Sequence, residues 1–90
     1  MKVIKRNKNI EDFDCFKIKN AIEQAMLAVN EYNKDILDRI TKNIIQEFEN
    51  EDLIPIEEIQ DTIEDYLIKE NLSEVAKEFI LYRDQRRRIR

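Results

Sequence analysis

The sequence predicts a mostly helical α+β fold, a four-helix bundle capped by a small three-stranded β-sheet. Four segments carry apolar residues at spacings of three and four, which is the pattern of a helix with one buried face. Three shorter apolar segments, two of them near the N-terminus, have the length of brief strands. Because 90 residues suffice for only one hydrophobic core, we expect residues 1–90 to form a single domain.

The first predicted element is a β-hairpin over residues 2–13, with apolar residues at 3–4 and at 10–13 and a polar turn between them. The chain contains no glycine that could occupy a turn position with a positive φ. Asparagine tolerates that conformation better than most other residues, so Asn7 or Asn9 is expected to adopt it.

A first helix is predicted near Cys15, because Asp14 can accept hydrogen bonds from the amides of its first turn. A second helix begins at Asn33 or Asp35, and an acidic, solvated loop over residues 49–52 follows it. The residues expected to face inward from these two helices are Ile18, Ala21, Ile22, Ala25, Met26 and Val29, then Ile36, Leu37, Ile40, Ile44 and Phe48.

A brief third strand is predicted at Leu53-Ile54, because Pro55 biases the residue before it toward an extended conformation. A third helix follows and ends at Asn71, and Ser73 is expected to cap a fourth. The residues expected to face inward from these helices are Ile56, Ile59, Ile63, Tyr66 and Leu67, then Val75, Ala76, Phe79, Ile80 and Tyr82.

The composition argues against an enzyme. Without glycine, the chain cannot form a P-loop or a Rossmann phosphate turn. Without histidine and with Cys15 as its one cysteine, it has no disulfide, no zinc constellation and no Ser-His or Cys-His pair. Cys15 is therefore interpreted as a small residue at a helix start.

Positive charge is concentrated at the two ends of a chain whose net charge is −4. The N-terminal group contains Lys2, Lys5, Arg6, Lys8, Lys17 and Lys19, and the C-terminal group contains Arg83, Arg86, Arg87 and Arg88. Such an asymmetry in an acidic chain indicates a local site for an anion.

Lys17 is the most informative of these cations, because the dipole of the first predicted helix disfavours a positive charge in its first turn by roughly 0.3–1 kcal/mol. A helix N-terminus can bind phosphate through its amides. Together with Lys17, and with Lys5 or Arg6 from the neighbouring strand, it would hold a triphosphate from two sides. Successive strand residues point to opposite faces, so contact by both Lys5 and Arg6 requires a twisted or frayed strand end.

Structural interpretations of the same residues stay open. Lysines on an edge strand also protect against aggregation, and a run of arginines is often the solvated end of a helix. Phe79, Tyr66 and Tyr82 are interpreted as core residues.

Several motifs resemble the ATP-cone, a small nucleotide-sensing domain of ribonucleotide reductases. Residues 3–6 (Val-Ile-Lys-Arg), followed by Phe13-Asp14 and Lys17-Ile18, resemble its opening signature, in which a Lys-Arg pair in a hairpin precedes Phe-Asp-x-x-Lys-Ile. Segments 56–67 and 75–83 resemble its third-helix motif and its closing segment, so the resemblance covers essentially the whole chain.

The chain departs from the family pattern at two places. The family turn Lys-Arg-Asp-Gly is here Lys5-Arg6-Asn7-Lys8, without the glycine. Ile56 and Gln60 stand where some members carry a hydroxyl residue and a histidine.

The resemblance implies a binding site for ATP or dATP, with Mg²⁺ as the companion of the triphosphate, between the hairpin and the helix ends. The residues that it assigns to the phosphates are Lys5, Arg6 and Lys17. Those that it places around the adenine are Glu11, Phe13, Ile59 and Gln60, with the backbone near Val3. It places Asp14 near the ribose.

The resemblance also implies a partner, the catalytic domain of a ribonucleotide reductase in the same chain, or another cone domain. In the family, ATP switches the reductase on and dATP switches it off, often through changed oligomerisation. Because the chain begins at Met1, we expect the N-terminal part of an anaerobic-type reductase, with a free-standing cone as the alternative.

Two other functions stay open, a helical interaction module without a ligand and nucleic-acid binding through the Arg-rich C-terminus. The net charge of −4 disfavours nucleic acid. No segment approaches the ~20 apolar residues of a membrane span, and the polar N-terminus does not resemble a secretory signal. We therefore expect a cytoplasmic protein that does not bind membranes.

Overall fold

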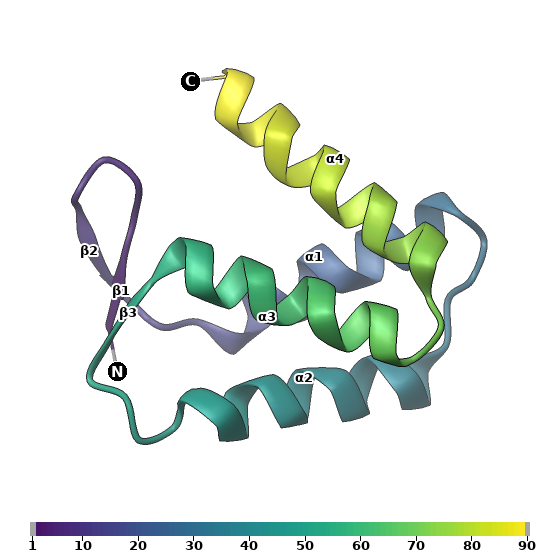
Figure 1. The fold of residues 1–90 in the computed structure, drawn as a ribbon, viewed down its shortest axis with the longest axis horizontal. Coiled ribbons are helices and arrows are strands. Elements are labelled where there is room, and N and C mark those ends of the chain that lie inside the picture. The colour runs from purple at the N-terminus through teal and green to yellow at the C-terminus, as the bar shows by residue number, and fades with distance from the viewer. Residues whose placement is uncertain (1, 90) are drawn as a thin grey trace.

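The fold joins a three-stranded sheet to four helices, as the sequence predicts (Figure 1). In the computed structural model the backbone is described for residues 2–89 and the side-chain surroundings for residues 2–83. In chain order the elements are β1 (Lys2–Ile4), β2 (Ile10–Asp12), α1 (Cys15–Ala28), α2 (Lys34–Phe48), β3 (Leu53–Pro55), α3 (Ile56–Lys69) and α4 (Ser73–Ile89). The sheet lies at one end of the helices (Figure 1).

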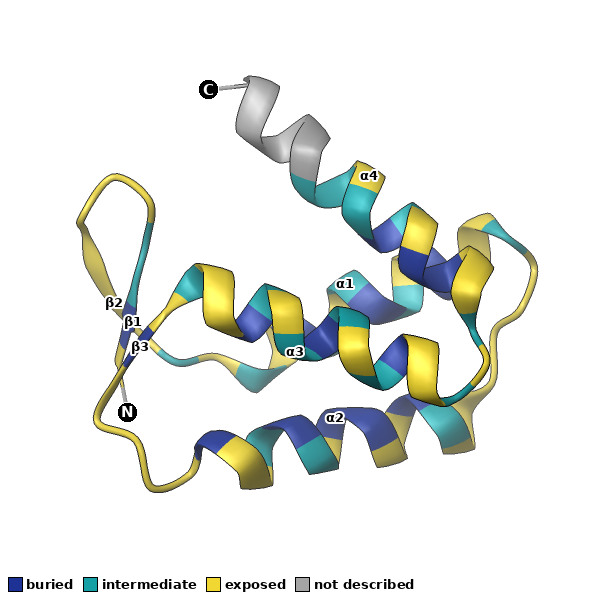
Figure 2. Ribbon diagram, in the orientation of Figure 1, coloured by how far each residue is buried: buried dark blue, intermediate teal, exposed yellow. Residues whose placement is uncertain are grey.

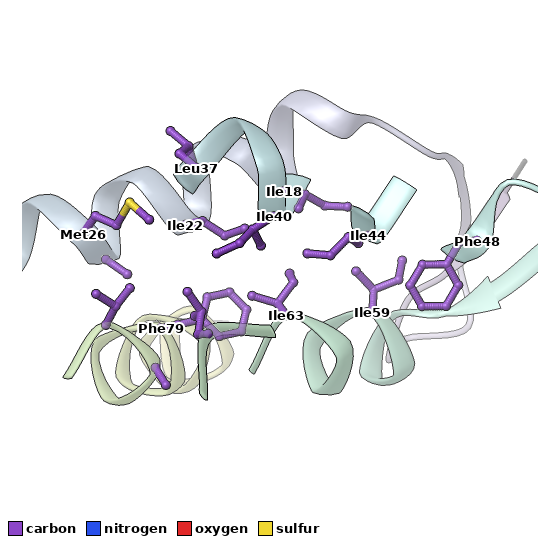
Figure 3. Close-up of a cluster of buried hydrophobic side chains, with 14 of the residues drawn as sticks. Ile18, Ile22, Met26, Leu37, Ile40, Ile44, Phe48, Ile59, Ile63 and Phe79 are labelled. Atoms are coloured by element: carbon purple, nitrogen blue, oxygen red, sulfur yellow. The ribbon is translucent and has the colours of Figure 1, made fainter. Parts of the chain in front are cut away.

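The helices pack in a ring, in which α1 contacts α2 and α4, and α3 contacts the same two helices from the other side. Among the described residues, each helix has buried positions on the side that faces the other helices and exposed positions on the side that faces solvent, most visibly in α2 (Figure 2). The interior is made of apolar side chains from all four helices, among them Ile22, Leu37, Ile40, Ile63 and Phe79, all of which are buried (Figure 3).

Most of the predicted inward-facing residues are buried in this core. Some lie at its margin and are only partly buried, namely Ala21, Val29, Ile36, Ile56 and Tyr66. Ile80 and Tyr82 are also half-buried. The predicted positions of Arg86, Arg87 and Arg88 in the last turns of a helix agree with the backbone of α4, but their side chains lie outside the described residues.

The sheet has β1 in its centre, antiparallel to β2 and parallel to β3. Val3 pairs with Glu11 on one side and with Ile54 on the other. Residues directly opposite one another in a sheet point to the same face. Val3 and Ile54 are buried against the helices, so Glu11 must also be directed to the helical side of the sheet.

The prediction that Asn7 or Asn9 adopts the positive φ of the hairpin turn is wrong. The residue with a positive φ is Lys8, at 72°, and neither Asn7 nor Asn9. The side-chain oxygen of Asn7 accepts a hydrogen bond from the amide of Asn9 at 3.0 Å, and the amide of Lys8 donates to the carbonyl of Lys5 at 2.9 Å. Asn7 therefore shapes the turn through its side chain, and the reversal of the backbone falls on the next residue.

Two helices end on an asparagine in the left-handed region, Asn30 after α1 (φ 58°) and Asn71 after α3 (φ 61°). After α3, the amide of Asn71 donates to the carbonyl of Ile68 and the amide of Leu72 donates to that of Leu67. This is the Schellman arrangement, in which glycine is the usual residue. Asparagine replaces it in this chain, and the predicted helix end at Asn71 is confirmed.

The helix starts are predicted with one exception. Asp14 precedes α1 and its carboxylate accepts from the amide of Phe16. Asn33 precedes α2 and accepts from the amide of Ile36. Ser73, however, is the first residue inside α4 and does not precede it. The amide of Ala76 donates to the carbonyl of Leu72, so the helical hydrogen bonds begin one residue earlier than expected.

The described part of the chain contains no helix with the combination of length and apolar character that crossing a bilayer demands.

Replacing Ile40 by Ala should lower the free energy of unfolding by about 2–5 kcal/mol, because Ile40 is fully buried and its loss leaves a cavity. Ile68 is the matched control, since it lies on α3 with 58% of its surface exposed, and Ile68→Ala should change stability by less than about 0.5 kcal/mol. Denaturant-induced unfolding, followed by circular dichroism, measures both values. Equal losses would show that the core is not where the structure places it.

Candidate functional site

A cavity of about 220 Å³ lies between the hairpin and helices α1, α3 and α4. One water molecule needs only about 10–15 Å³ of such space, so the cavity can receive a molecule much larger than water. Its lining comprises Val3, Lys5, Arg6, Glu11, Asp12, Phe13, Asp14, Lys17, Ile18, Ala21, Ile56, Ile59, Gln60, Ile63, Phe79, Tyr82 and Arg83.

All nine residues proposed from the sequence belong to this lining. They come from four separate places: the hairpin, the segment before α1, the first turn of α1 and the first turns of α3. The structure therefore brings the predicted set together around one space. Which of them touches a nucleotide stays a prediction.

The floor of the cavity is apolar and is formed by residues whose helical spacing predicted them as core. Ile59 and Ile63 of α3 lie one turn apart, and Ile18 of α1 and Phe79 of α4 join them. These four side chains are buried. They make a surface suited to a flat or aliphatic group of a ligand.

The rim of the cavity carries the cations. Lys5 and Arg6 lie beyond the last residue of β1, Ile4, where the chain has left the strand. The alternation that would direct them to opposite faces no longer applies there. Both side chains can therefore line the cavity. This is the frayed strand end that contact by both Lys5 and Arg6 was expected to require.

Glu11 lies between two of these cations. Its Oε1 atom is 3.4 Å from Nζ of Lys5, and its Oε2 atom is 3.6 Å from Nζ of Lys17. The hydrogen bond from Lys5 and the positive charge of Lys5 hold the pKa of the Glu11 carboxyl below its usual value, and Lys17 acts in the same direction. Lys5 and Lys17 thus lie close together through a shared carboxylate.

Arg6 turns across the cavity toward α3. Its Nε atom is 3.7 Å from Oε1 of Glu57, and its Nη2 atom donates a hydrogen bond of 3.3 Å to Oε1 of Gln60. These contacts connect the hairpin to the first turns of α3. Arg6 and Gln60 are therefore neighbours, although they are 54 positions apart in the sequence.

The N-terminus of α1 differs from the predicted phosphate site. The Oδ1 atom of Asp14 accepts the hydrogen bond of the Phe16 amide at 2.9 Å, and the amide of Lys17 donates to the carbonyl oxygen of Asp14 at 3.1 Å. The protein's own groups therefore use these first-turn amides. Phosphate binding at this helix would depend on the Lys17 side chain and not on those two amides.

Sequence reasoning missed the contribution of α4. Tyr82 and Arg83 line the cavity beside Phe79, in positions that had been interpreted as core or as a solvated helix end. Arg83 pairs with Glu64 of α3, and both side chains are about four-fifths buried. Burial raises the pKa of the Glu64 carboxyl, and the charge of Arg83 partly opposes that shift. The spacing of three and four that continues the apolar face of α4 to Tyr82 and Arg83 was the available signal.

A cation-rimmed cavity with an apolar floor is suited to a ligand that is apolar at one end and anionic at the other. The comparisons with known proteins identify the family of the chain. A model of the ATP cone domain matches residues 1–88, and the chain therefore belongs to the ATP-cone family.

Several ribonucleotide reductases are similar to this chain. A vitamin B12-dependent ribonucleoside-diphosphate reductase of Thermoplasma acidophilum is 33% identical over 93 residues, which cover 98% of this chain and 12% of that protein. The ribonucleoside-diphosphate reductase subunit alpha of Chlamydia pneumoniae is 32% identical, with 98% of this chain and 9% of that protein covered. The corresponding subunit of Chlamydia trachomatis is 31% identical, with 100% and 10% covered.

The chain thus spans 9–12% of the length of these curated relatives. Their names describe a vitamin B12-dependent enzyme and alpha subunits, so they do not support the specific expectation of an anaerobic-type reductase.

The shared carboxylate makes a prediction about acidity. Because Lys5 is the larger cause of the low Glu11 pKa, Lys5→Ala should raise that pKa toward its ordinary value more than Lys17→Ala does. In the unchanged protein, Glu11 should keep its charge to a lower pH than an ordinary glutamate, so both ion pairs should persist until the pH falls below the usual range. A pH titration of the Glu11 side-chain carboxyl ¹³C resonance measures the Glu11 pKa in the unchanged protein and in both variants. A larger rise in Lys17→Ala would contradict the arrangement described.

Proposed function

We propose that this chain is a regulatory domain that binds ATP or dATP in the cavity and controls a ribonucleotide reductase. The observation that carries the proposal is the convergence of Lys5, Arg6 and Lys17 on the rim of an apolar cavity. A nucleoside triphosphate has the same division between a base and a strongly anionic chain. Membership of the ATP-cone family supports the adenine nucleotide as the ligand class.

The polar groups within the lining are suited to the two ends of such a ligand. The lysines and Arg6 supply charge-assisted donors for phosphate oxygens. Glu11 and Gln60 supply an acceptor and an amide at the edge of the apolar floor, where Phe13 and Ile59 would cover the faces of the base, beside the backbone of Val3.

We assign magnesium to the triphosphate and not to the protein. Among the described residues, no three acidic, histidine or cysteine side chains form a group that could hold a metal ion. Mg²⁺ commonly binds proteins through substrate phosphates with few protein ligands.

Regulation requires that ATP and dATP stabilise two states of the reductase by different amounts. The two nucleotides differ only in the 2′-hydroxyl, so a polar group near the ribose must distinguish them. Asp14 is our candidate, because it lines the cavity and one of its oxygens is already fixed by the Phe16 amide. Its carboxylate can present the second oxygen to the hydroxyl.

We further propose that residues 1–90 act as one domain in the cytoplasm, and that the partner is the catalytic domain of a reductase in the same chain or another cone. Changed oligomerisation is the proposed means of control. Because the similar proteins include more than one kind of reductase, the proposal names the reductase without its class.

The first test removes a phosphate-binding cation. Lys17→Ala should weaken Mg-ATP binding about 10- to 100-fold, which is the value of one charge-assisted hydrogen bond. Lys77→Ala is the matched control, because Lys77 is also exposed (72% against 70%) and also pairs with a glutamate (3.5 Å against 3.6 Å), but lies on α4 away from the cavity lining. Calorimetric titration measures both.

Failure of this test would favour the other functions. If the unchanged protein is indifferent to ATP in both calorimetry and thermal shift, the interpretation as a ligand-free interaction module replaces the nucleotide sensor. If it instead binds nucleic acid with an affinity that falls steeply with salt, binding is through phosphate contacts to a polymer.

The second test concerns ATP and dATP. Asp14→Ser keeps an oxygen for the helix cap, whereas Asp14→Ala removes the cap at a cost of about 0.5–2 kcal/mol. Both variants should lose the difference between ATP and dATP affinity, but only Asp14→Ala should also lose thermal stability. A ratio of affinities that is unchanged in Asp14→Ser would refute the assignment of the ribose contact.

A further inference from the structure

The carboxylate of Glu11 lies where an anion bound by Lys5 and Lys17 would have to lie. Each of its oxygens faces a different lysine, at 3.4 Å for Lys5 and 3.6 Å for Lys17. A phosphate group offers the same kind of acceptor oxygens to the same donors. The carboxylate and a phosphate chain therefore compete for one pair of cations.

The backbone places Glu11 in this position. Glu11 is paired with Val3 in the register of β1 and β2, and Val3 is buried against the helices. Glu11 consequently faces the helical side of the sheet, where Lys17 stands in the first turn of α1. A slip of one residue in this register would direct Glu11 away from the cavity.

The other acidic side chains of the lining have different partners. The carboxylate of Asp12 pairs with Lys2, and that of Asp14 accepts from the Phe16 amide. Glu57 of α3, which is not part of the lining, pairs with Arg6. Among these groups, Glu11 is the one that contacts both lysines.

The pairs that Glu11 makes are of the kind that a ligand can replace. The Glu11 side chain is 44% exposed, that of Lys17 is 70% exposed and that of Lys5 is 27% exposed. Ion pairs of a carboxylate so open to water are weak. A chain of several phosphates brings several times the negative charge of the single carboxylate that it displaces, whereas a single phosphate brings a charge of only about −1.5 to −2.

We propose that Glu11 is an internal competitor of the phosphate chain, which weakens every anion that needs Lys5 and Lys17, so that a polyphosphate still occupies the site at concentrations where a single phosphate does not. This inference rests on the proposed function, because the natural polyphosphate is taken to be that of the nucleotide. It adds that the binding of the triphosphate is an exchange of one anion for another, in which Glu11 must leave both lysines.

The test uses inorganic triphosphate as the probe, because it has no base and its affinity is independent of any contact between Glu11 and adenine. Glu11→Gln keeps the size of the side chain and removes its charge. This variant should bind inorganic triphosphate roughly three- to tenfold more tightly than the unchanged protein, as expected when the ligand no longer has to displace a carboxylate held by two weak ion pairs. Single phosphate should bind more weakly than triphosphate to both proteins.

Glu74→Gln is the matched control. Glu74 also pairs with a lysine, Lys77, at 3.5 Å, but it lies at the start of α4 and is not part of the cavity lining. The Glu74→Gln variant changes the net charge by the same amount as Glu11→Gln, and it should leave the affinity for triphosphate within about twofold of that of the unchanged protein. An equal gain in both variants would mean that net charge alone explains the effect, and would overturn the inference.

A second measurement needs no variant. In the unchanged protein, saturating inorganic triphosphate should move the Glu11 carboxyl resonance and raise the Glu11 pKa, because the lysines that now lower it turn to the phosphates and an anion comes near. A Glu11 resonance that does not respond while triphosphate binds would overturn the inference even if Glu11→Gln fails to fold.

The outcomes separate this inference from the proposed function. If ATP binds to the unchanged protein but Glu11→Gln binds inorganic triphosphate no more tightly, the competitor role is wrong and the nucleotide site stands. If Glu11→Gln binds triphosphate more tightly but ATP binds no better than triphosphate alone, the competitor role stands and the adenine-specific function fails. If neither protein binds triphosphate, the competitor role is overturned.

Discussion

The pairing of β1 with its two neighbours is the constraint on which the site depends. The side chains of Val3 in β1 and Ile54 in β3 are buried between the sheet and the helices, and they hold the two together. Because Glu11 is opposite Val3, burial of one apolar residue also decides where a carboxylate points. Because β1 ends at Ile4, the side chains of Lys5 and Arg6 need not point to opposite faces of the sheet, and both line the cavity.

The charges of the site are balanced within the protein. Lys5 and Lys17 share Glu11, and Arg6 reaches Glu57. A cavity with several cations and no counter-charge would be costly because of repulsion among them. Carboxylates that are exposed and weakly held reduce that repulsion and remain replaceable, which suits a site that is proposed to bind and release a strongly charged ligand.

The sequence was most informative where neighbouring residues decide the structure. The apolar spacing within each helix depends only on the helical repeat, and Asp14 and Asn33 cap helices that begin one residue later. The lining of the cavity was also accessible, because its motifs resemble those of a known family. Local patterns did not show that α4 lines the cavity, because residues that line a cavity and residues that pack in a core recur with the same helical spacing. Tyr82 continues the apolar stripe that contains Phe79, and both line the cavity.

By itself, then, the sequence determined the number and kind of the elements, the caps of α1 and α2, most of the apolar faces and nine of the residues that line the cavity. Only the tertiary structure decided how the charges among them pair. Glu11 meets Lys17 because a strand register and the packing of the sheet on the helices bring them together. Lys8 has the positive φ in a turn where the Asn7 side chain accepts from the Asn9 amide. Neither relation can be derived from spacing, because the first joins elements that meet only in the folded chain and the second depends on which of three adjacent polar residues the turn places in the left-handed region.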